Sequence, residues 1–167
     1  MALDLGVLAL VPAPFVVMAL AFSPLGEVRL AVPVAVLQYG MGWAEAFVWS
    51  LAGNLLVLPV AAWTYPRLEA LLRRWGRAGR LLDRIEARMR RRSGRRVERY
   101  EEAAVGAVIA VPLPASGAWT GVLVAHFFGL PWRKVAPAYC VGCVAATAIA
   151  VALVEAGLLA FPFFYGT

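Results

Sequence analysis

The chain has 167 residues, of which 62% are hydrophobic and 16% are charged, and it contains only two cysteines. So apolar a chain cannot bury its side chains in one soluble core, and two cysteines cannot build a disulfide framework. The composition therefore excludes a soluble enzyme, a secreted disulfide scaffold and a disordered chain, and it indicates an integral membrane protein. Residues 67–102 hold 13 basic and 6 acidic residues, a net charge of +7, whereas the rest of the chain carries −1.

The first 40 residues contain two apolar arms, 5–22 and 28–40, separated by the segment Ser23-Pro24-Leu25-Gly26-Glu27. Proline and glycine in that segment stop a helix. The second arm would be about 20 Å long as a helix, which is too short to cross a hydrocarbon core of about 30 Å. We therefore predict that residues 5–40 form a re-entrant hairpin.

The next segment, 43–63, is apolar apart from Glu45, Asn54 and small residues. Its 21 residues are enough to cross the bilayer. Aromatic residues typical of a membrane interface end it, at Trp63 and Tyr65. We predict a transmembrane helix over 43–63.

Residues 66–102 form the Arg-rich segment, which follows the first membrane unit. Apolar residues recur there every three or four positions, as expected for one stripe of an amphipathic helix: Leu68, Leu71, Trp75, Ala78, Leu82, Ile85 and Met89. Such a helix can lie on anionic lipid headgroups, or its three heptads can form a dimer contact. No aromatic platform accompanies the basic residues, so we do not expect nucleic-acid binding.

The second half repeats the pattern of the first. Two short arms, 103–111 and 118–129, flank the breaker Pro112-Leu113-Pro114-Ala115-Ser116-Gly117, and a long apolar run follows over 135–161. We predict a second re-entrant hairpin over 103–129 and a second transmembrane helix over 135–161. The alternative for both hairpins is a pair of tilted helices with proline kinks.

An internal repeat supports the hairpins. An offset of 89 residues superposes Gly40 on Gly129, Trp43 on Trp132 and Gly53 on Gly142. Basic connections stay in the cytoplasm, so residues 66–102 are expected inside and the two crossing helices run in opposite directions. The fold predicted is an all-α membrane protein with an inverted repeat, made of units 1–65 and 103–167, with an amphipathic cytoplasmic helix between them.

Charges at membrane depth are costly, so they are candidates for function. Glu27 and Arg29 lie where the first hairpin turns. A carboxylate there can bind a proton or a cation, and a guanidinium can tune its pKa or hold a phosphate. The alternative is an ion pair or a backbone cap that only satisfies the turn.

Polar and helix-breaking residues elsewhere complete the predicted substrate or ion site. From the first unit we include Asn54, and from the second breaker and the arm after it Pro112, Pro114, Ser116, Gly117 and Thr120. Three residues are expected to support the site from further out: Gln38, His126 and Glu155. For Asn54 the alternative is a contact between helices, and for His126 it is a capped residue at the membrane interface. Glu155 can pair with Arg29 or reach the outer interface.

No catalytic or metal signature accompanies these residues. The pair Cys140 and Cys143 has a redox or metal spacing, but in an apolar helix without further ligands we expect it to pack. No nucleophile motif or phosphate loop occurs. We therefore predict neither an enzyme nor a protein with a cofactor or a bound metal.

The chain resembles the small multidrug export protein family. The motifs that carry the resemblance are Glu27-Val28-Arg29-Leu30-Ala31-Val32-Pro33 leading to Tyr39-Gly40, Gly53-Asn54 with Pro59, Val111-Pro112-Leu113-Pro114, and Gly117-Ala118-Trp119-Thr120-Gly121. That family is in turn distantly similar to DedA-like membrane proteins, and this similarity implies inverted re-entrant hairpins, proton-linked transport and polyprenyl-phosphate lipid carriers. DedA-like proteins carry acidic residues and arginines at both hairpins, whereas the second breaker here has none, which leaves Arg29 as the candidate phosphate ligand.

Three functions follow as hypotheses. The first is a multi-pass transporter of the cell (inner) membrane that exports a small amphipathic substrate, coupled to protons or cations, from a midplane site between the hairpins. The second is a translocase for a polyprenyl-phosphate lipid. The third is a scaffold without transport activity that recruits partners through residues 66–102. We expect lipids as partners and, since so small a bundle encloses little volume, a homodimer.

Overall fold

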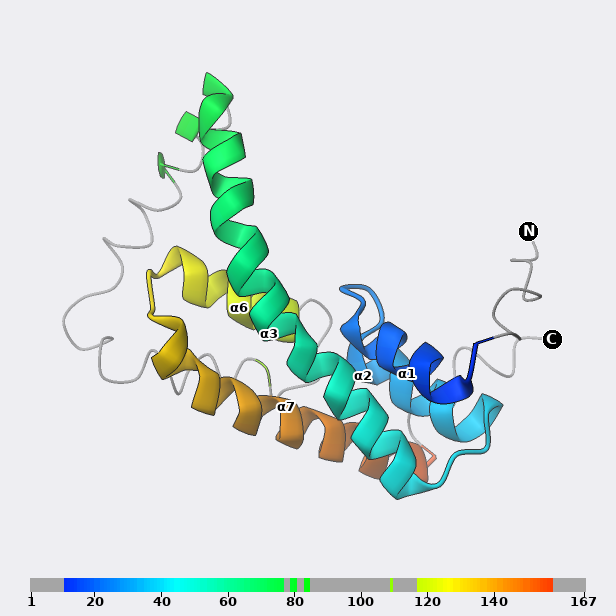
Figure 1. Ribbon diagram of the computed structural model, residues 1–167. Coiled ribbons are helices and arrows are strands. Elements are labelled where there is room, and N and C mark those ends of the chain that lie inside the picture. The colour runs from blue at the N-terminus through cyan, green and yellow to red at the C-terminus, as the bar shows by residue number, and fades with distance from the viewer. Residues whose placement is uncertain (1–10, 77–78, 81–82, 85–108, 110–116, 158–167) are drawn as a thin grey trace. The chain divides into compact units, whose positions relative to one another are not determined.

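The computed structural model describes residues 11–76, 79–80, 83–84, 109 and 117–157 (Figure 1). All regular elements in this part of the chain are helices. They are, in order, α1 (Ala13–Phe22), α2 (Glu27–Pro33), the π-helix η2 (Val34–Gln38), α3 (Trp43–Arg74), α6 (Ala118–Phe127) and α7 (Trp132–Glu155). The all-helical class predicted from composition is confirmed.

The chain divides into two compact units. One comprises Met1–Leu56 with Cys143–Thr167, and the other comprises Val57–Gly142. The two long helices α3 and α7 each contribute to both units, and we describe each unit by itself.

A helix, a four-residue turn and a second helix open the first unit. α1 ends at Phe22, the N–H of its C-cap residue Ser23 donates to the carbonyl oxygen of Ala19 at 3.0 Å, and Pro24 cannot continue the helix. Gly26 is buried against α1, since a Cβ there would lie 2.7 Å from the carbonyl oxygen of Leu20. The turn therefore falls within the segment 23–27 in which proline and glycine predicted a break.

α2 continues into a π-helix rather than ending. Pro33 lies inside the helix, where it has no N–H to donate to the carbonyl one turn earlier. The wider π turn that follows over Val34–Gln38 accommodates this lost bond. α2 and η2 together have 12 residues, so they reach only about 18 Å.

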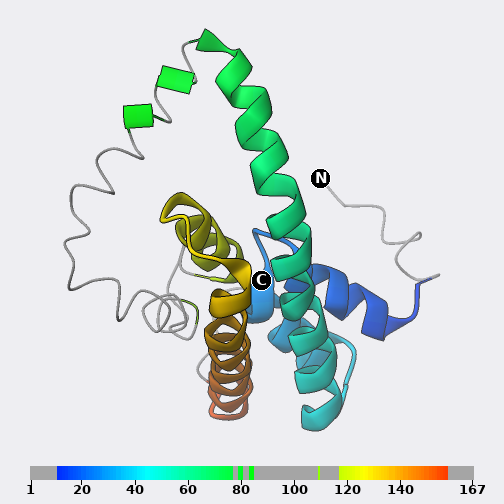
Figure 2. The same cartoon turned by 60° about the vertical axis from the view of Figure 1, so that its left-hand side comes forward.

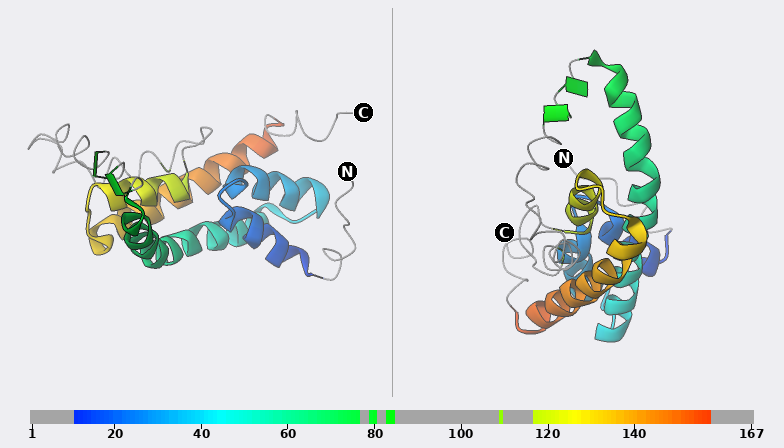
Figure 3. Two further views of the ribbon diagram at one scale, coloured as in Figure 1. Left: turned by 90° about the horizontal axis from the view of Figure 1, so that it is seen from above. Right: turned by 90° about the vertical axis from the view of Figure 1, so that its left-hand side faces the viewer.

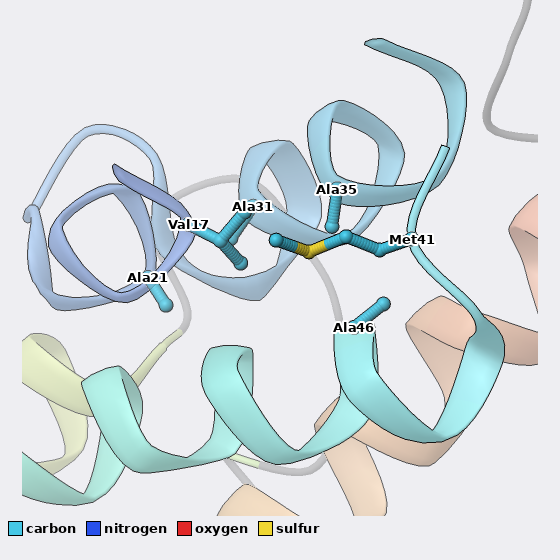
Figure 4. Close-up of a cluster of buried hydrophobic side chains, with 6 residues drawn as sticks. All are labelled: Val17, Ala21, Ala31, Ala35, Met41 and Ala46. Atoms are coloured by element: carbon cyan, nitrogen blue, oxygen red, sulfur yellow. The ribbon is translucent and has the colours of Figure 1, made fainter. Parts of the chain in front are cut away.

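α1 and α2 lie beside the first half of α3 in the first unit (Figure 2), and small side chains fill the contact between them. Figure 4 shows the buried cluster that joins α1, α2 and η2 to the start of α3: Val17, Ala21, Ala31, Ala35, Met41 and Ala46. A second buried cluster joins α2 to the C-terminal half of α7: Val28, Val32, Ala146, Ala150 and Val154. α2 therefore packs against α1 and α3 through one cluster and against α7 through the other. Together these contacts position the turn at which α2 begins.

The first long helix extends further than predicted. The apolar run ends at Trp63, but α3 continues to Arg74 and passes through Pro59 and Pro66. Near Pro66 the side chain of Arg67 donates from Nη1 to the carbonyl oxygen of Trp63 at 2.8 Å, and its guanidinium lies 3.9 Å from the centre of the Trp63 ring. Pro66 has no N–H to donate to the carbonyl oxygen of Ala62, and Arg67 adds a side-chain hydrogen bond at the neighbouring carbonyl, that of Trp63. The helix therefore continues past the end of the apolar run.

The second long helix starts earlier than predicted, at Trp132 rather than at residue 135. Pro131 caps it, because its carbonyl oxygen accepts from the N–H of Lys134 at 2.8 Å. The helix ends at Glu155 and a turn follows, with Gly157 at φ +73°. Arg133 and Lys134 therefore lie inside its first turn. The helix ends before the predicted end at residue 161, and residues 158–161 lie outside the described residues.

Two stretches 89 residues apart share the same local geometry. Gly40 (φ +62°) and Gly129 (φ +68°) each end a helical arm in the left-handed conformation that favours glycine. Three residues later a long helix begins, at Trp43 and at Trp132.

The second hairpin is described only in part. Of its predicted first arm only Ile109 belongs to the described residues, and the breaker at 112–116 lies outside them. Its second arm is the 10-residue α6, which reaches about 15 Å and is too short to cross a bilayer. Beyond residue 84, the predicted Arg-rich helix also lies outside the described residues.

Both long helices expose much of their apolar surface. In the most apolar 18-residue window of each, 33% of α3 and 39% of α7 is buried. Valines and leucines lie on the outside of these helices, among them Val48, Leu56, Val141 and Val144. Helices that are this long, apolar and exposed suit a lipid environment.

Candidate functional site

Glu27 occupies an unusual backbone conformation at the turn of the first hairpin. It is the first residue of α2, is half-buried and has φ +49°, the one positive φ outside glycine in the described part of the chain. This region costs an L-residue about 1–2 kcal/mol. The turn imposes it, because buried Gly26 presses on α1 and the Glu27 N–H donates to the carbonyl oxygen of Ser23 at 3.1 Å. Strain of this kind accumulates at functional positions.

A second polar position lies on the buried face of α3. Asn54 is 2% exposed, and Ser50, one turn earlier on the same face, is fully buried. Between them Gly53 allows close approach of α1, since a Cβ there would lie 2.2 Å from the carbonyl oxygen of Met18. Asn54 therefore lies in the interior of the first unit. Ser50 was missed, although its four-residue spacing from Asn54 in an apolar helix was a usable signal.

The structure places the other predicted residues in two different units. Glu27, Arg29, Gln38, Asn54 and Glu155 belong to the first unit, with Gln38 and Glu155 exposed at helix ends. Gly117, Thr120 and His126 belong to the second unit, where Gly117 precedes α6 and the other two lie on it. Pro112, Pro114 and Ser116 lie outside the described residues. A joint site between the hairpins therefore stays a prediction.

A cluster of side chains from α3 and α6 is the best-defined polar arrangement in the second unit. His126 Nε2 lies 2.8 Å from Glu69 Oε2, and the Tyr65 hydroxyl donates to the carbonyl oxygen of Trp119 at 3.1 Å. The His126 ring stacks on Trp132 at the start of α7, with ring centres 6.1 Å apart and planes at 9°. Figure 3 shows α6 beside the second half of α3 within this unit.

Glu69 also takes part in a chain of ion pairs along the end of α3. Its Oε1 accepts from Arg73 Nε at 2.7 Å, and Arg73 in turn pairs with Asp83. Glu69 lies beyond Trp63 and Tyr65, outside the predicted span 43–63. The hydrogen bond from Arg73 holds the pKa of the Glu69 carboxyl below its ordinary value, with a smaller contribution from His126, and partial burial opposes both.

A cavity of about 50 Å³ lies beside the His126–Glu69 pair. Its lining is apolar and aromatic except for that pair, and comprises Tyr65, Leu68, Glu69, Leu72, Leu123, His126 and Phe127. Sequence reasoning had placed His126 as a supporting residue but missed Tyr65 and Glu69. Their four-residue spacing, which puts both on one helix face, was the available signal.

No cluster of three or more histidine, cysteine or acidic side chains suited to a metal ion occurs among the residues that the structure describes. Cys143 is buried in α7 and Cys140, three residues earlier, is exposed. Neither cysteine forms a disulfide bond in the part of the chain that the structure describes. The site residues thus offer hydrogen bonds, charge and aromatic surface.

The model of a family described as small multi-drug export protein matches residues 27–149, which is most of the chain and includes Glu27, α3, α6 and most of α7. No curated protein and no solved structure matches significantly.

Proposed function

Because the chain belongs to the family of small multi-drug export proteins, we propose that it exports a small amphipathic substrate across the cell membrane in exchange for protons or cations. The family match and the two exposed apolar helices support a membrane transporter. The observation that carries the coupling proposal is Glu27, a carboxylate held in a strained conformation where two short helices meet.

The proposed architecture is an inverted repeat of hairpin and crossing helix, in units 1–65 and 103–167. Two observations support it. The arms α1, α2 with η2, and α6 are all too short to cross. The left-handed glycines and the helix starts also recur at the same spacing of 89 residues. Discontinuous helices of this kind place binding sites near the bilayer midplane in many transporters.

The orientation proposed follows from charge. Residues 66–102, with their net charge of +7, face the cytoplasm, and the chain spans the inner membrane more than once. We further propose that two copies form the working unit, because one copy encloses little volume.

Within this architecture Glu27 exchanges the proton or cation and Arg29, two residues away, tunes its affinity. In this proposal the substrate contacts come from Asn54, from the second breaker at residues 112–117 and from the arm at 118–129. No observation favours a polyprenyl-phosphate translocase or a scaffold over export.

The test is transport by the purified protein in liposomes with an imposed pH gradient. Glu27→Gln keeps the size and hydrogen-bonding capacity of the side chain but removes the titrating carboxylate, so we expect the pH dependence of uptake to disappear. Glu45→Gln removes an exposed carboxylate from the first turn of α3 and serves as the matched control. Unchanged pH dependence in Glu27→Gln would refute coupling at this residue.

A further inference from the structure

The cavity beside Glu69 combines an apolar wall with one carboxylate. Three leucines, Leu68, Leu72 and Leu123, line it together with the rings of Tyr65 and Phe127. Aromatic faces attract cations, and leucine side chains bind apolar groups through the hydrophobic effect. Such a lining suits a ligand with an apolar body and a positive charge.

Glu69 is the one acidic side chain among the described residues that line the cavity, so its carboxylate is the group that a cation would meet there. Arg73 pairs with both Glu69 and Asp83, so one positive charge is shared between two carboxylates. Each carboxylate oxygen has two acceptor positions, and His126 and Arg73 each occupy one on a different oxygen of Glu69. The carboxylate therefore keeps acceptor capacity for a ligand.

We propose that this cavity binds the ammonium group of an amphipathic organic cation, with Glu69 as its counter-ion and Tyr65 and Phe127 as its aromatic walls. The inference rests on the proposed function, for which it names the substrate class. The volume of about 50 Å³ is several times the 10–15 Å³ that one water needs, which admits a small alkylated ammonium head. The cavity is half-open, so the body of a larger cation can extend outside it.

The position of the cavity fits an entry site for such a substrate. It lies at the end of α3 beyond Trp63, where the predicted span meets the aqueous side. Amphipathic cations concentrate at that level of a bilayer because one end is apolar and the other is charged.

The experiment is equilibrium binding to the full chain, purified in a neutral detergent. Benzyltrimethylammonium is the probe, and its neutral isostere neopentylbenzene and benzenesulfonate are the comparison ligands. Tryptophan fluorescence reports binding, since Trp119 and Trp132 both contact residues of the cavity. We expect saturable binding of the cation, and affinities about tenfold or more weaker for the neutral and anionic ligands.

Two variants separate the carboxylate from the cavity. Glu69→Gln can keep a hydrogen bond to His126, and we expect it to weaken cation binding about tenfold or more while binding of neopentylbenzene stays unchanged. Leu123→Trp places a larger side chain in the cavity and should weaken the binding of both benzyltrimethylammonium and neopentylbenzene. Glu45→Gln removes a carboxylate elsewhere on α3 and should bind as the wild type does.

The proposal is overturned if the wild type shows no saturable cation binding, if Glu69→Gln binds the cation equally well, or if the cation and its neutral isostere bind alike. Binding is measured without a gradient or a membrane potential. If the protein binds the cation but does not transport it, the proposed export function is refuted and the cation site is retained. If the protein transports but does not bind the cation, the cation site is refuted and the export function is retained.

Discussion

Glu27 has both a strained backbone conformation and a charged side chain. Substitutions can separate the effect of the strain on stability from the effect of the charge. At φ +49° glycine is unstrained, whereas alanine retains the strain that glutamate has. We expect Glu27→Gly to be about 1 kcal/mol more stable than Glu27→Ala, although both lack the carboxylate. Thermal unfolding in detergent measures the difference. Equal stabilities would mean that the backbone at this turn relaxes without penalty.

Gly53 sets how closely α1 and α3 approach in the first unit. In Gly53→Ala the new Cβ would lie 2.2 Å from the Met18 carbonyl oxygen and 2.8 Å from the Ala21 Cβ, so α1 must shift. We expect a loss of about 1–3 kcal/mol in unfolding free energy. Gly42→Ala is the control, because nothing lies within 4 Å of its Cβ position. If the two variants were equally stable, the close packing would be disproved.

At the residue scale the sequence identified Glu27 and Asn54 because charge and amide groups are rare in apolar segments. It missed Tyr65 and Glu69 for the opposite reason. Tyr65 looked like an ordinary interfacial aromatic, and Glu69 was one of six acidic residues in a strongly charged segment. Only the packing of α6 against α3 distinguishes Glu69 from those neighbours, and that contact joins residues 57 positions apart.

Glycines in the left-handed conformation end one helical arm in each half of the chain. The Cβ positions of Gly40 and Gly129 meet nothing within 4 Å, so an alanine there adds backbone strain alone. We expect Gly40→Ala and Gly129→Ala each to lose about 1 kcal/mol of stability. Gly76→Ala, also in open space but without a positive φ, should lose none. Chemical unfolding provides the comparison, and unequal losses would argue against equivalent helix ends.

The stability that Glu69 contributes depends on pH, mainly through its hydrogen bond from Arg73 within α3 and less through His126 on α6. The pKa of Glu69 is lowered in the folded protein, so the stabilisation is full above the unfolded value of about 4.3 and is lost as pH falls through the folded value. We expect acidification from pH 7 to pH 3 to lower the melting temperature of the wild type more than that of Glu69→Gln. Parallel decreases in the two proteins would show that Glu69 adds no stability through its charge.

At the element scale, apolar length located both long helices but misplaced three of their ends. The hydropathy of a segment indicates where side chains favour a lipid environment. The end of a helix is set instead by where its backbone hydrogen bonds stop. α3 therefore continues past Trp63 with support from Arg67, and α7 begins at Trp132 because Pro131 caps it and stops at Glu155 before the turn at Gly157. The break between α1 and α2 was predictable because Pro24 and Gly26 act locally.

For the whole molecule, the proposed orientation places the end of α3 in the cytoplasm. Gly76 is exposed, with open space at its Cβ position, so Gly76→Cys is a suitable label site in a chain in which Cys140 and Cys143 are replaced by alanine. A membrane-impermeant maleimide should label it in inside-out vesicles and not in intact cells. Labelling in intact cells would reverse the proposed orientation.

Proton movement through Glu27 is the central claim, and a reconstituted flux assay tests it most directly. The wild type, Glu27→Gln and Glu45→Gln are each placed in liposomes that contain a pH-sensitive dye, and benzyltrimethylammonium is added outside. We predict that the cation drives a change of internal pH in the wild type and in Glu45→Gln, and that Glu27→Gln gives the trace of protein-free liposomes. A wild-type response in Glu27→Gln, or no response in any of the three, would contradict the account.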